Sequence, residues 1–139
     1  MVNVSYNFLE VSLDDFDVKS TTLWIKKVLS KHSVSNADLG YVFVSDEFLL
    51  KMNQEYLNHD FYTDIITFNY NEENSLAGEM YVSLDRVREN AKDFAGGDFD
   101  RELSRVIIHG VLHLIGFDDQ TGDDEAKIRE EEEVCLRLK

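Results

Sequence analysis

The segment IIHGVLHLIGFDD, residues 107–119, constrains the fold most strongly, because it predicts both a helix and the place where that helix ends. Its apolar residues recur at the spacing of a buried helical face, and the pattern begins near Arg101. Gly116 follows at the point where a helix needs a residue that tolerates a positive φ angle. We therefore expect the chain to turn sharply at Gly116 and to run back toward the helix.

Two histidines share one face of this predicted helix. His109 and His113 lie four residues apart, about one turn, so both imidazoles can bind the same cation. The turn at Gly116 can bring back a third ligand, and Asp119 lies three residues further along. The pattern H-x-x-x-H-x-x-G-x-x-D supplies two nitrogens and one carboxylate, which leaves the fourth position of a zinc ion open for water. We predict that His109, His113 and Asp119 bind one catalytic zinc ion.

Neighbouring residues refine this prediction. Asp118 competes with Asp119 as a ligand, but the spacing favours Asp119, and Asp118 is expected to stabilise the turn or to support a ligand. Gly110 stands where H-E-x-x-H peptidases carry the glutamate that takes a proton from the metal-bound water, which disfavours a standard zinc peptidase. His32 and His59 have no second histidine at this spacing and no similar motif in the sequence, so we expect them to be surface or capping residues. Catalytic residues beyond the metal ligands stay unassigned.

The composition fits one globular domain that spans residues 1–139. The chain is 43% hydrophobic and 30% charged, and no proline, repeat or low-complexity segment marks a linker. Its net charge of -14 repels phosphate backbones and anionic lipids, so any RNA must meet a local basic patch. Cys135 is the single cysteine, and no apolar run approaches the roughly 20 residues of a membrane span. The start MVNVSYNF lacks the features of a signal peptide, so we expect a cytoplasmic protein.

Hydrophobic periodicity predicts an α+β fold. Strands are expected at residues 2–8, 39–45, 64–70 and 78–83, and the last two should pair as a hairpin. Helices are expected at residues 21–32, 46–57, 83–94, 101–115 and 123–139. Ser45 is the expected N-cap of the second helix, and Asp98 or Asp100 that of the fourth. The predicted apolar faces are Leu23, Trp24, Val28 and Leu29 in the first helix, and Ile128, Val134, Cys135 and Leu138 in the last.

Three segments resemble one known family. HGVLHLIGFDD resembles the signature H-G-x-L-H-L-x-G-[FY]-D-H of the YbeY family, bacterial endoribonucleases of ribosomal RNA maturation. It matches at every fixed position except the last, where Asp119 replaces a third histidine. MNQEYLNHDFYTDIITF resembles the family's L-N-x-x-Y-R-x-x-D-x-P-T-D-V-L-S-F, and GEMYVS resembles its G-D-I-x-I-S. The resemblance runs from the middle of the chain to Asp119.

The resemblance implies a single α+β domain with a small mixed sheet of about four strands, helices packed on it, and a metzincin-like metal helix and turn. It assigns zinc to His109, His113 and Asp119. Another divalent metal would also suit this set, because two histidines and a carboxylate also bind iron. The implied activity is metal-dependent cleavage of single-stranded RNA, in the 3′-end maturation of small-subunit (16S) ribosomal RNA and in ribosome quality control. The expected partners are ribosomal RNA and the ribosome, together with protein partners, and neither DNA nor a membrane.

Two departures from the family bear on the mechanism. Leu57 replaces an arginine that could hold the scissile phosphate, and Tyr62 replaces a proline. Another cation must substitute, or activity is weak. Asp60 and Asp64 are acidic candidates for orienting a ligand or accepting a proton, against a plain role in turn hydrogen bonding. The nearest basic residues, which could instead be solvated partners of acidic neighbours, are Arg86, Arg88, Lys92, Arg101 and Arg105.

Three other functions remain open. The first is a ribosome-assembly or RNA-binding factor in which the metal only braces the helix and turn, a hypothesis that Leu57 favours. A small metallopeptidase is weakened by Gly110. An iron(II) oxygenase is disfavoured, because all three ligands come from one local segment and the sequence has no evident cosubstrate-binding motif.

Overall fold

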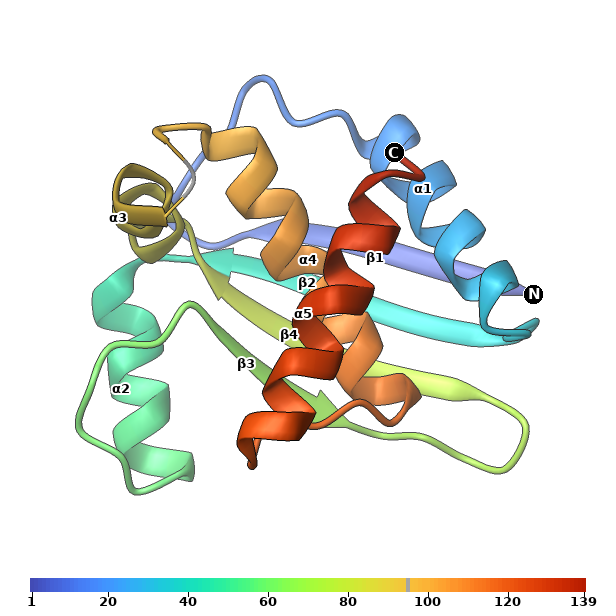
Figure 1. Cartoon of the computed structure of the whole chain (residues 1–139). Coiled ribbons are helices and arrows are strands. Elements are labelled where there is room, and N and C mark those ends of the chain that lie inside the picture. The colour runs from blue at the N-terminus through green and yellow to red at the C-terminus, as the bar shows by residue number, and fades with distance from the viewer. Residues whose placement is uncertain (95) are drawn as a thin grey trace.

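A computed structural model of the protein describes residues 1–94 and 96–139 (Figure 1). Its strands are β1 (Val2–Phe8), β2 (Ala37–Val44), β3 (Ile65–Asn69) and β4 (Leu76–Ser83). Its helices are α1 (Val18–Lys31), α2 (Asp46–Tyr56), α3 (Leu84–Phe94), α4 (Phe99–Ile115) and α5 (Gly122–Leu136). The predicted α+β class is confirmed. Among the described residues, no helix is both long and apolar enough to cross a membrane.

The four strands form one mixed sheet in the order β1-β2-β4-β3. The pairs β1–β2 and β2–β4 are parallel, whereas β3 pairs antiparallel with β4 at the edge of the sheet. The hairpin that we predicted for the strands at residues 64–70 and 78–83 is therefore confirmed. Alternation in β1 places Val2, Val4, Tyr6 and Phe8 against the core and leaves the residues between them exposed.

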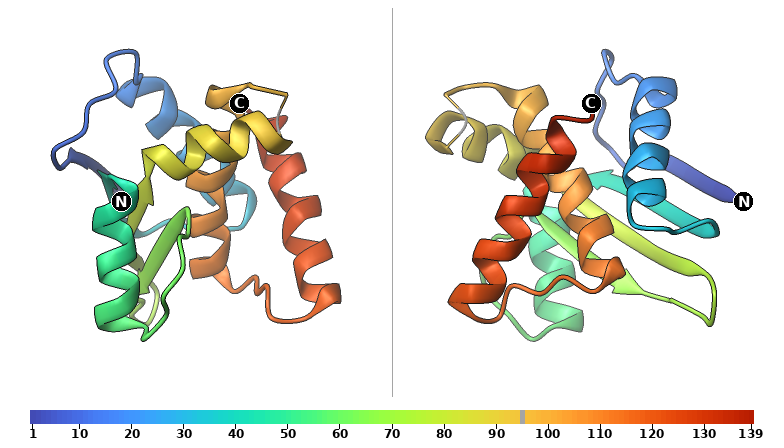
Figure 2. Two further views of the ribbon diagram at one scale, coloured as in Figure 1. Left: turned by 90° about the vertical axis from the view of Figure 1, so that its left-hand side faces the viewer. Right: turned by 45° about the vertical axis from the view of Figure 1, so that its right-hand side comes forward.

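Helices cover the two faces of the sheet unequally (Figure 2). The larger core lies between the sheet and the helices α1 and α4, and α5 packs on the outside of α4. On the opposite face α2 covers a small cluster that contains Leu49, Met52 and Ile66. The edge strand β3 packs against α4, which is the helix that carries the two histidines.

The predicted caps are mostly confirmed. Ser45 is the N-cap of α2, and its hydroxyl accepts a hydrogen bond from the N–H of Phe48. Asp98, rather than Asp100, caps α4 and accepts from the N–H of Arg101. Gly116 ends α4 with a φ angle of 131°, as the sequence predicted.

The predicted apolar faces need two corrections. In α1 the side chain of Leu23 is exposed, and Ile25 is buried in its place, because Ile25 is one turn from Leu29 on the face turned toward the sheet. In α5 Ile128 and Cys135 are buried as predicted, but Val134 is only half-buried, and so is Leu138, which lies beyond the end of the helix at Leu136. The third buried side chain of α5 is Glu132, a charged residue that the apolar pattern could not indicate.

Candidate metal centre and active site

A close contact between α4 and the sheet positions the candidate site. Gly110 faces the sheet, and a Cβ atom at this position would lie 2.8 Å from Cγ of Met80 and 3.1 Å from Cδ1 of Ile65. The missing side chain therefore lets α4 lie directly on β3 and β4. The same contact leaves no room for a glutamate at position 110, which agrees with the argument against a standard zinc peptidase.

His109 is held between two carboxylates. Its Nδ1 atom lies 2.6 Å from Oε2 of Glu132 on α5, and its Nε2 atom lies 3.7 Å from Oδ2 of Asp119. The side chain of His109 is 20% exposed and that of Glu132 only 2%. Nδ1 thus faces the protein interior, and Nε2 faces Asp119, the predicted third metal ligand.

His113 lies one turn further along α4 and is exposed. The rings of His109 and His113 are nearly parallel, with centroids 6.3 Å apart and an interplanar angle of 8°. The ligand atoms of His113, Asp118 and Asp119 all lie within 4.8 Å of one another. Asp119 therefore lies near both histidines, but His109 is not part of the close group that His113, Asp118 and Asp119 form.

The turn after Gly116 returns the chain as the sequence predicted. The N–H groups of Gly116 and Phe117 both donate to the carbonyl of Leu112, which closes the end of α4. The carboxylate of Asp118 accepts a hydrogen bond of 2.7 Å from the N–H of Asp119. This contact is the stabilising role in the turn that we predicted for Asp118, although its carboxylate also lies near the ligand atoms.

One pair of the predicted donors has a separation near that of a zinc site. Nitrogen and oxygen ligands of a tetrahedral zinc ion lie about 2.0–2.2 Å from the metal and hence about 3.3–3.5 Å apart. The separation of 3.7 Å between His109 and Asp119 is close to that value. The ligand atoms of His113 and Asp119 lie within 4.8 Å of each other, so these donors would have to move closer to bind one ion, and the side chain of Asp119 is 48% exposed.

A cavity of about 210 Å³ opens beside His109. Charged side chains dominate its lining: Asp64, Arg105, His109, Asp119, Glu125, Arg129 and Glu132. Acidic groups outnumber basic ones there, which suits a bound cation better than a free anion. Asp64 therefore belongs to the candidate site, whereas Asp60 is exposed and accepts a hydrogen bond from Gln54 outside this lining.

Arg105 forms hydrogen bonds with two acidic residues of this cavity and with Glu102 beside it. Its guanidinium donates to both carboxylate oxygens of Glu102 at 2.9 and 2.8 Å, to Glu132 at 3.3 Å and to Asp64 at 3.4 Å. The hydrogen bonds to Glu102 raise the pKa of Arg105 above its ordinary value, although burial opposes this. Burial raises the pKa of Asp64, and the charge of Arg105 only partly opposes the effect.

The other predicted basic residues are partners of nearby carboxylates. Each forms an ion pair: Arg86 with Asp46, Arg88 with Asp85, Lys92 with Glu89, and Arg101 with Glu133. These residues do not line the cavity beside His109. Among the five predicted cations, only Arg105 is at the site, and its donors are directed to carboxylates.

Sequence analysis missed three charged residues of this cavity, all on α5: Glu125, Arg129 and Glu132. They lie in a run of charged residues that is typical of a solvated helix. A spacing of four residues from the buried Ile128 was the one available signal for Glu132. Arg129 is 70% exposed and forms only an i,i+4 ion pair with Glu125.

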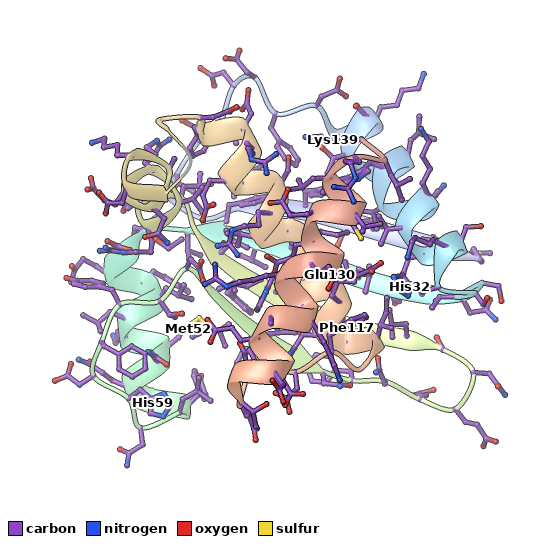
Figure 3. All side chains as sticks on the ribbon, in the orientation of Figure 1. His32, Met52, His59, Phe117, Glu130 and Lys139 are labelled. Carbon is purple, nitrogen blue, oxygen red and sulfur yellow. The ribbon has the colours of Figure 1, made fainter. Side chains whose placement is uncertain are left out.

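His32 has neighbours in the fold that the sequence did not indicate. It is the C-cap residue of α1, as expected, but its Nε2 atom also lies 3.0 Å from Glu131, and its ring meets the edge of Phe117 (Figure 3). The ligand atoms of His32, Glu131 and Cys135 lie within 4.8 Å of one another, so this group could also hold an ion. Lys31, however, already places an ammonium group 2.7 Å from Glu131.

His59 lies at the opposite end of the molecule from this group, below α2 in Figure 3. It is exposed and stacks on Phe61, with ring centroids 5.0 Å apart. The predicted surface position of His59 is confirmed.

Fold and site together define a class of protein: a small α+β domain in which a buried helix carries a histidine pair, and a glycine turn returns a carboxylate to it. The family model described as "Endoribonuclease YbeY" matches residues 7–138. A protein named endoribonuclease YbeY from Bacteroides thetaiotaomicron is 45% identical over 130 residues, which cover 94% of this chain and 93% of the relative. The one from Flavobacterium psychrophilum is 41% identical over 138 residues, covering 97% and 95%.

The architecture also matches a solved structure. The solution structure of TM1509 from Thermotoga maritima superposes with a TM-score of 0.71 at 26% identity, and the match covers 99% of this chain and 88% of the other. The chain belongs to the YbeY endoribonuclease family.

Proposed function

We propose that this chain is a zinc-dependent endoribonuclease that cleaves single-stranded RNA during 3′-end maturation of 16S ribosomal RNA. Membership of a family named for endoribonuclease activity supports the reaction class. The observation that carries the metal assignment is the approach of the Asp119 carboxylate to Nε2 of His109, together with the close grouping of His113 with Asp118 and Asp119. The family resemblance supports the ribosomal substrate and the role in ribosome quality control, in the cytoplasm.

In this proposal His109, His113 and Asp119 hold the metal at the mouth of the cavity. Zinc supplies a Lewis acid for a phosphate oxygen and lowers the pKa of a bound water. The carboxyl of Asp64 lines the same cavity, and its raised pKa lets it retain a proton more readily than an exposed aspartate does. Asp64 is therefore our candidate for holding a proton beside the scissile phosphate.

Arg129 is our candidate for the cation that replaces the family's arginine at Leu57. It lies at the cavity, and its exposed pair with Glu125 is of a kind that contributes little to stability. Its guanidinium can therefore turn toward a phosphate at small cost. An Arg129→Gln variant should cleave RNA more slowly while it keeps zinc, whereas Lys127→Gln, on the same helix but outside the cavity lining, should leave both unchanged.

The deciding experiment measures zinc by elemental analysis and cleavage of a single-stranded ribosomal RNA fragment with the same proteins. The wild type should contain nearly one zinc ion per chain, and His113→Ala and Asp119→Ala should lose both zinc and cleavage. His59→Ala is the matched control and should keep both, since this histidine is exposed and remote. Cys135→Ser should also keep both, and loss of zinc in that variant would place the ion in the His32 group instead.

The second candidate function is a metal-braced RNA-binding or ribosome-assembly factor. Leu57 favours it, because an exposed leucine ends α2 where the family carries arginine. The same experiment separates the two functions: zinc without cleavage in the wild type would support the binding factor. Cleavage that depends on His113 and Asp119 would exclude it.

A further inference from the structure

The carboxylate that contacts His109 from α5 lies on the buried face of that helix, with Ile128 and Cys135. Glu132 is flanked by Glu131, which faces Lys31 and His32, and by Glu133, which pairs with Arg101. Only Glu132 points inward, and its side chain is 2% exposed. A carboxylate so far from water is stable only when both of its oxygens have partners.

Both oxygens of Glu132 are engaged by groups of the candidate site. Oε1 accepts from Arg105 at 3.3 Å, and Oε2 lies 2.6 Å from Nδ1 of His109. Arginine can only donate, and an ionised carboxylate can only accept. With Glu132 ionised, the short contact is a hydrogen bond that Nδ1 of His109 donates.

We propose that Glu132 is a positioning residue: it accepts a hydrogen bond from Nδ1 of His109 and thereby holds the imidazole in the tautomer whose Nε2 atom is free for the metal. This inference rests on the proposed function, since it assigns a role relative to the zinc ligands. It also explains why a glutamate is buried in α5, a helix that packs on α4 rather than on the sheet. A carboxylate behind a histidine ligand orients the ring and makes it a stronger ligand.

Arg105 makes the obvious substitution unusually informative. In a Glu132→Gln variant, the donating guanidinium of Arg105 attracts the amide oxygen, so the amide NH₂ group turns toward His109. Nδ1 must then accept a hydrogen bond, which moves the ring proton to Nε2 and blocks the ligand position. Glutamine should therefore weaken zinc binding although it fills nearly the same volume as glutamate.

The test compares zinc affinity, by chelator competition, in three variants that each remove one charge from consecutive positions of α5. Glu132→Gln should bind zinc about 10- to 100-fold more weakly than the wild type. Glu131→Gln and Glu133→Gln should match the wild type, since their partners lie outside the cavity. Equal zinc affinity in all three variants would overturn the inference.

A second measurement has a wild-type arm that does not depend on how the variant folds. Long-range ¹H–¹⁵N spectra of the unaltered, metal-free protein should show His109 protonated at Nδ1 and bare at Nε2, and Glu132→Gln should reverse this pattern. A wild-type His109 protonated at Nε2 would overturn the inference. If the wild type has the expected tautomer but binds no zinc, the proposed function fails instead.

Discussion

His109 and Asp119 face each other across 3.7 Å, but the protein holds them by different means. His109 lies on a helix that is packed on the sheet through Gly110, and Glu132 fixes its ring from a second helix. Asp119 lies in an exposed turn, and its N–H donates a hydrogen bond to the carboxylate of Asp118. The helix half of the site is therefore preorganised by packing, whereas the turn half depends on backbone conformation and on the metal itself.

The largest predicted effect comes from disturbing the packed half. In Gly78→Ala the new Cβ would lie 2.7 Å from Cδ1 of Leu114 on α4 and 2.9 Å from the backbone oxygen of Phe68. Because the backbone of the β3–β4 hairpin cannot yield easily, we expect a loss of about 2–3 kcal/mol in the free energy of unfolding. Urea denaturation measures it. Gly40→Ala, with a nearest contact of 3.5 Å, is the control on the neighbouring strand and should be nearly neutral.

A smaller effect is expected from the turn half. Gly116 has a φ angle of 131° and open space around it, so Gly116→Ala adds backbone strain but no clash. We expect a loss of about 1–2 kcal/mol in stability, together with weaker zinc binding because Asp119 is displaced. Gly122→Ala is the control, since that glycine begins α5 in open space without a positive φ angle. Unchanged zinc affinity in Gly116→Ala would show that the turn does not position the ligand.

The third prediction concerns the anchor of α4 on the sheet. The buried hydroxyl of Tyr41 donates a hydrogen bond of 2.7 Å to the carbonyl of Ile107, two residues before His109. Tyr41→Phe should lower stability by about 1 kcal/mol, which thermal denaturation would detect. Tyr6→Phe is the matched control, because Tyr6 stacks on Tyr41 but its hydroxyl meets only Thr22 in a partly buried position. A larger loss in Tyr6→Phe would contradict the anchoring role.

The smallest effect is expected on the side of α5 that faces away from the site. Burial opposes ionisation of Glu131, but hydrogen bonds from Lys31 and His32 outweigh it and hold the pKa of Glu131 below its ordinary value of 4.5. A carboxyl with a lowered native pKa stabilises the fold above the ordinary value and loses this contribution as the pH falls through the native one.

Glu131→Gln should therefore cost at most about 0.5 kcal/mol at neutral pH, and the difference from the wild type should shrink below pH 4.5. Denaturation of the metal-free proteins across this pH range measures the difference. A difference that grows in acid would contradict the assignment, because it would require a raised native pKa.

Local patterns predicted much of the fold. The alternation of β1, the hairpin residues and the caps at Ser45 and Gly116 are all confirmed. These features depend on neighbours in the chain, so one sequence contains the necessary information. Leu23 shows the limit: the helix was correctly predicted, but its orientation toward the sheet decided that Ile25 would be buried instead.

The candidate site likewise combines residues that local geometry brings together with residues that only helix packing brings together. His109, His113, Gly116 and Asp119 lie within eleven residues, and helical geometry with one glycine turn is enough to gather them. Glu132 and Arg105 meet because α5 packs across α4, and Asp64 joins them at the start of the edge strand. In the sequence Glu132 is one of four consecutive glutamates, all of them typical of a solvated helix. The sequence by itself thus determined the helix, the turn and the candidate ligands that they carry, whereas only the tertiary structure decided which glutamate leaves water, because burial depends on how two distant helices pack.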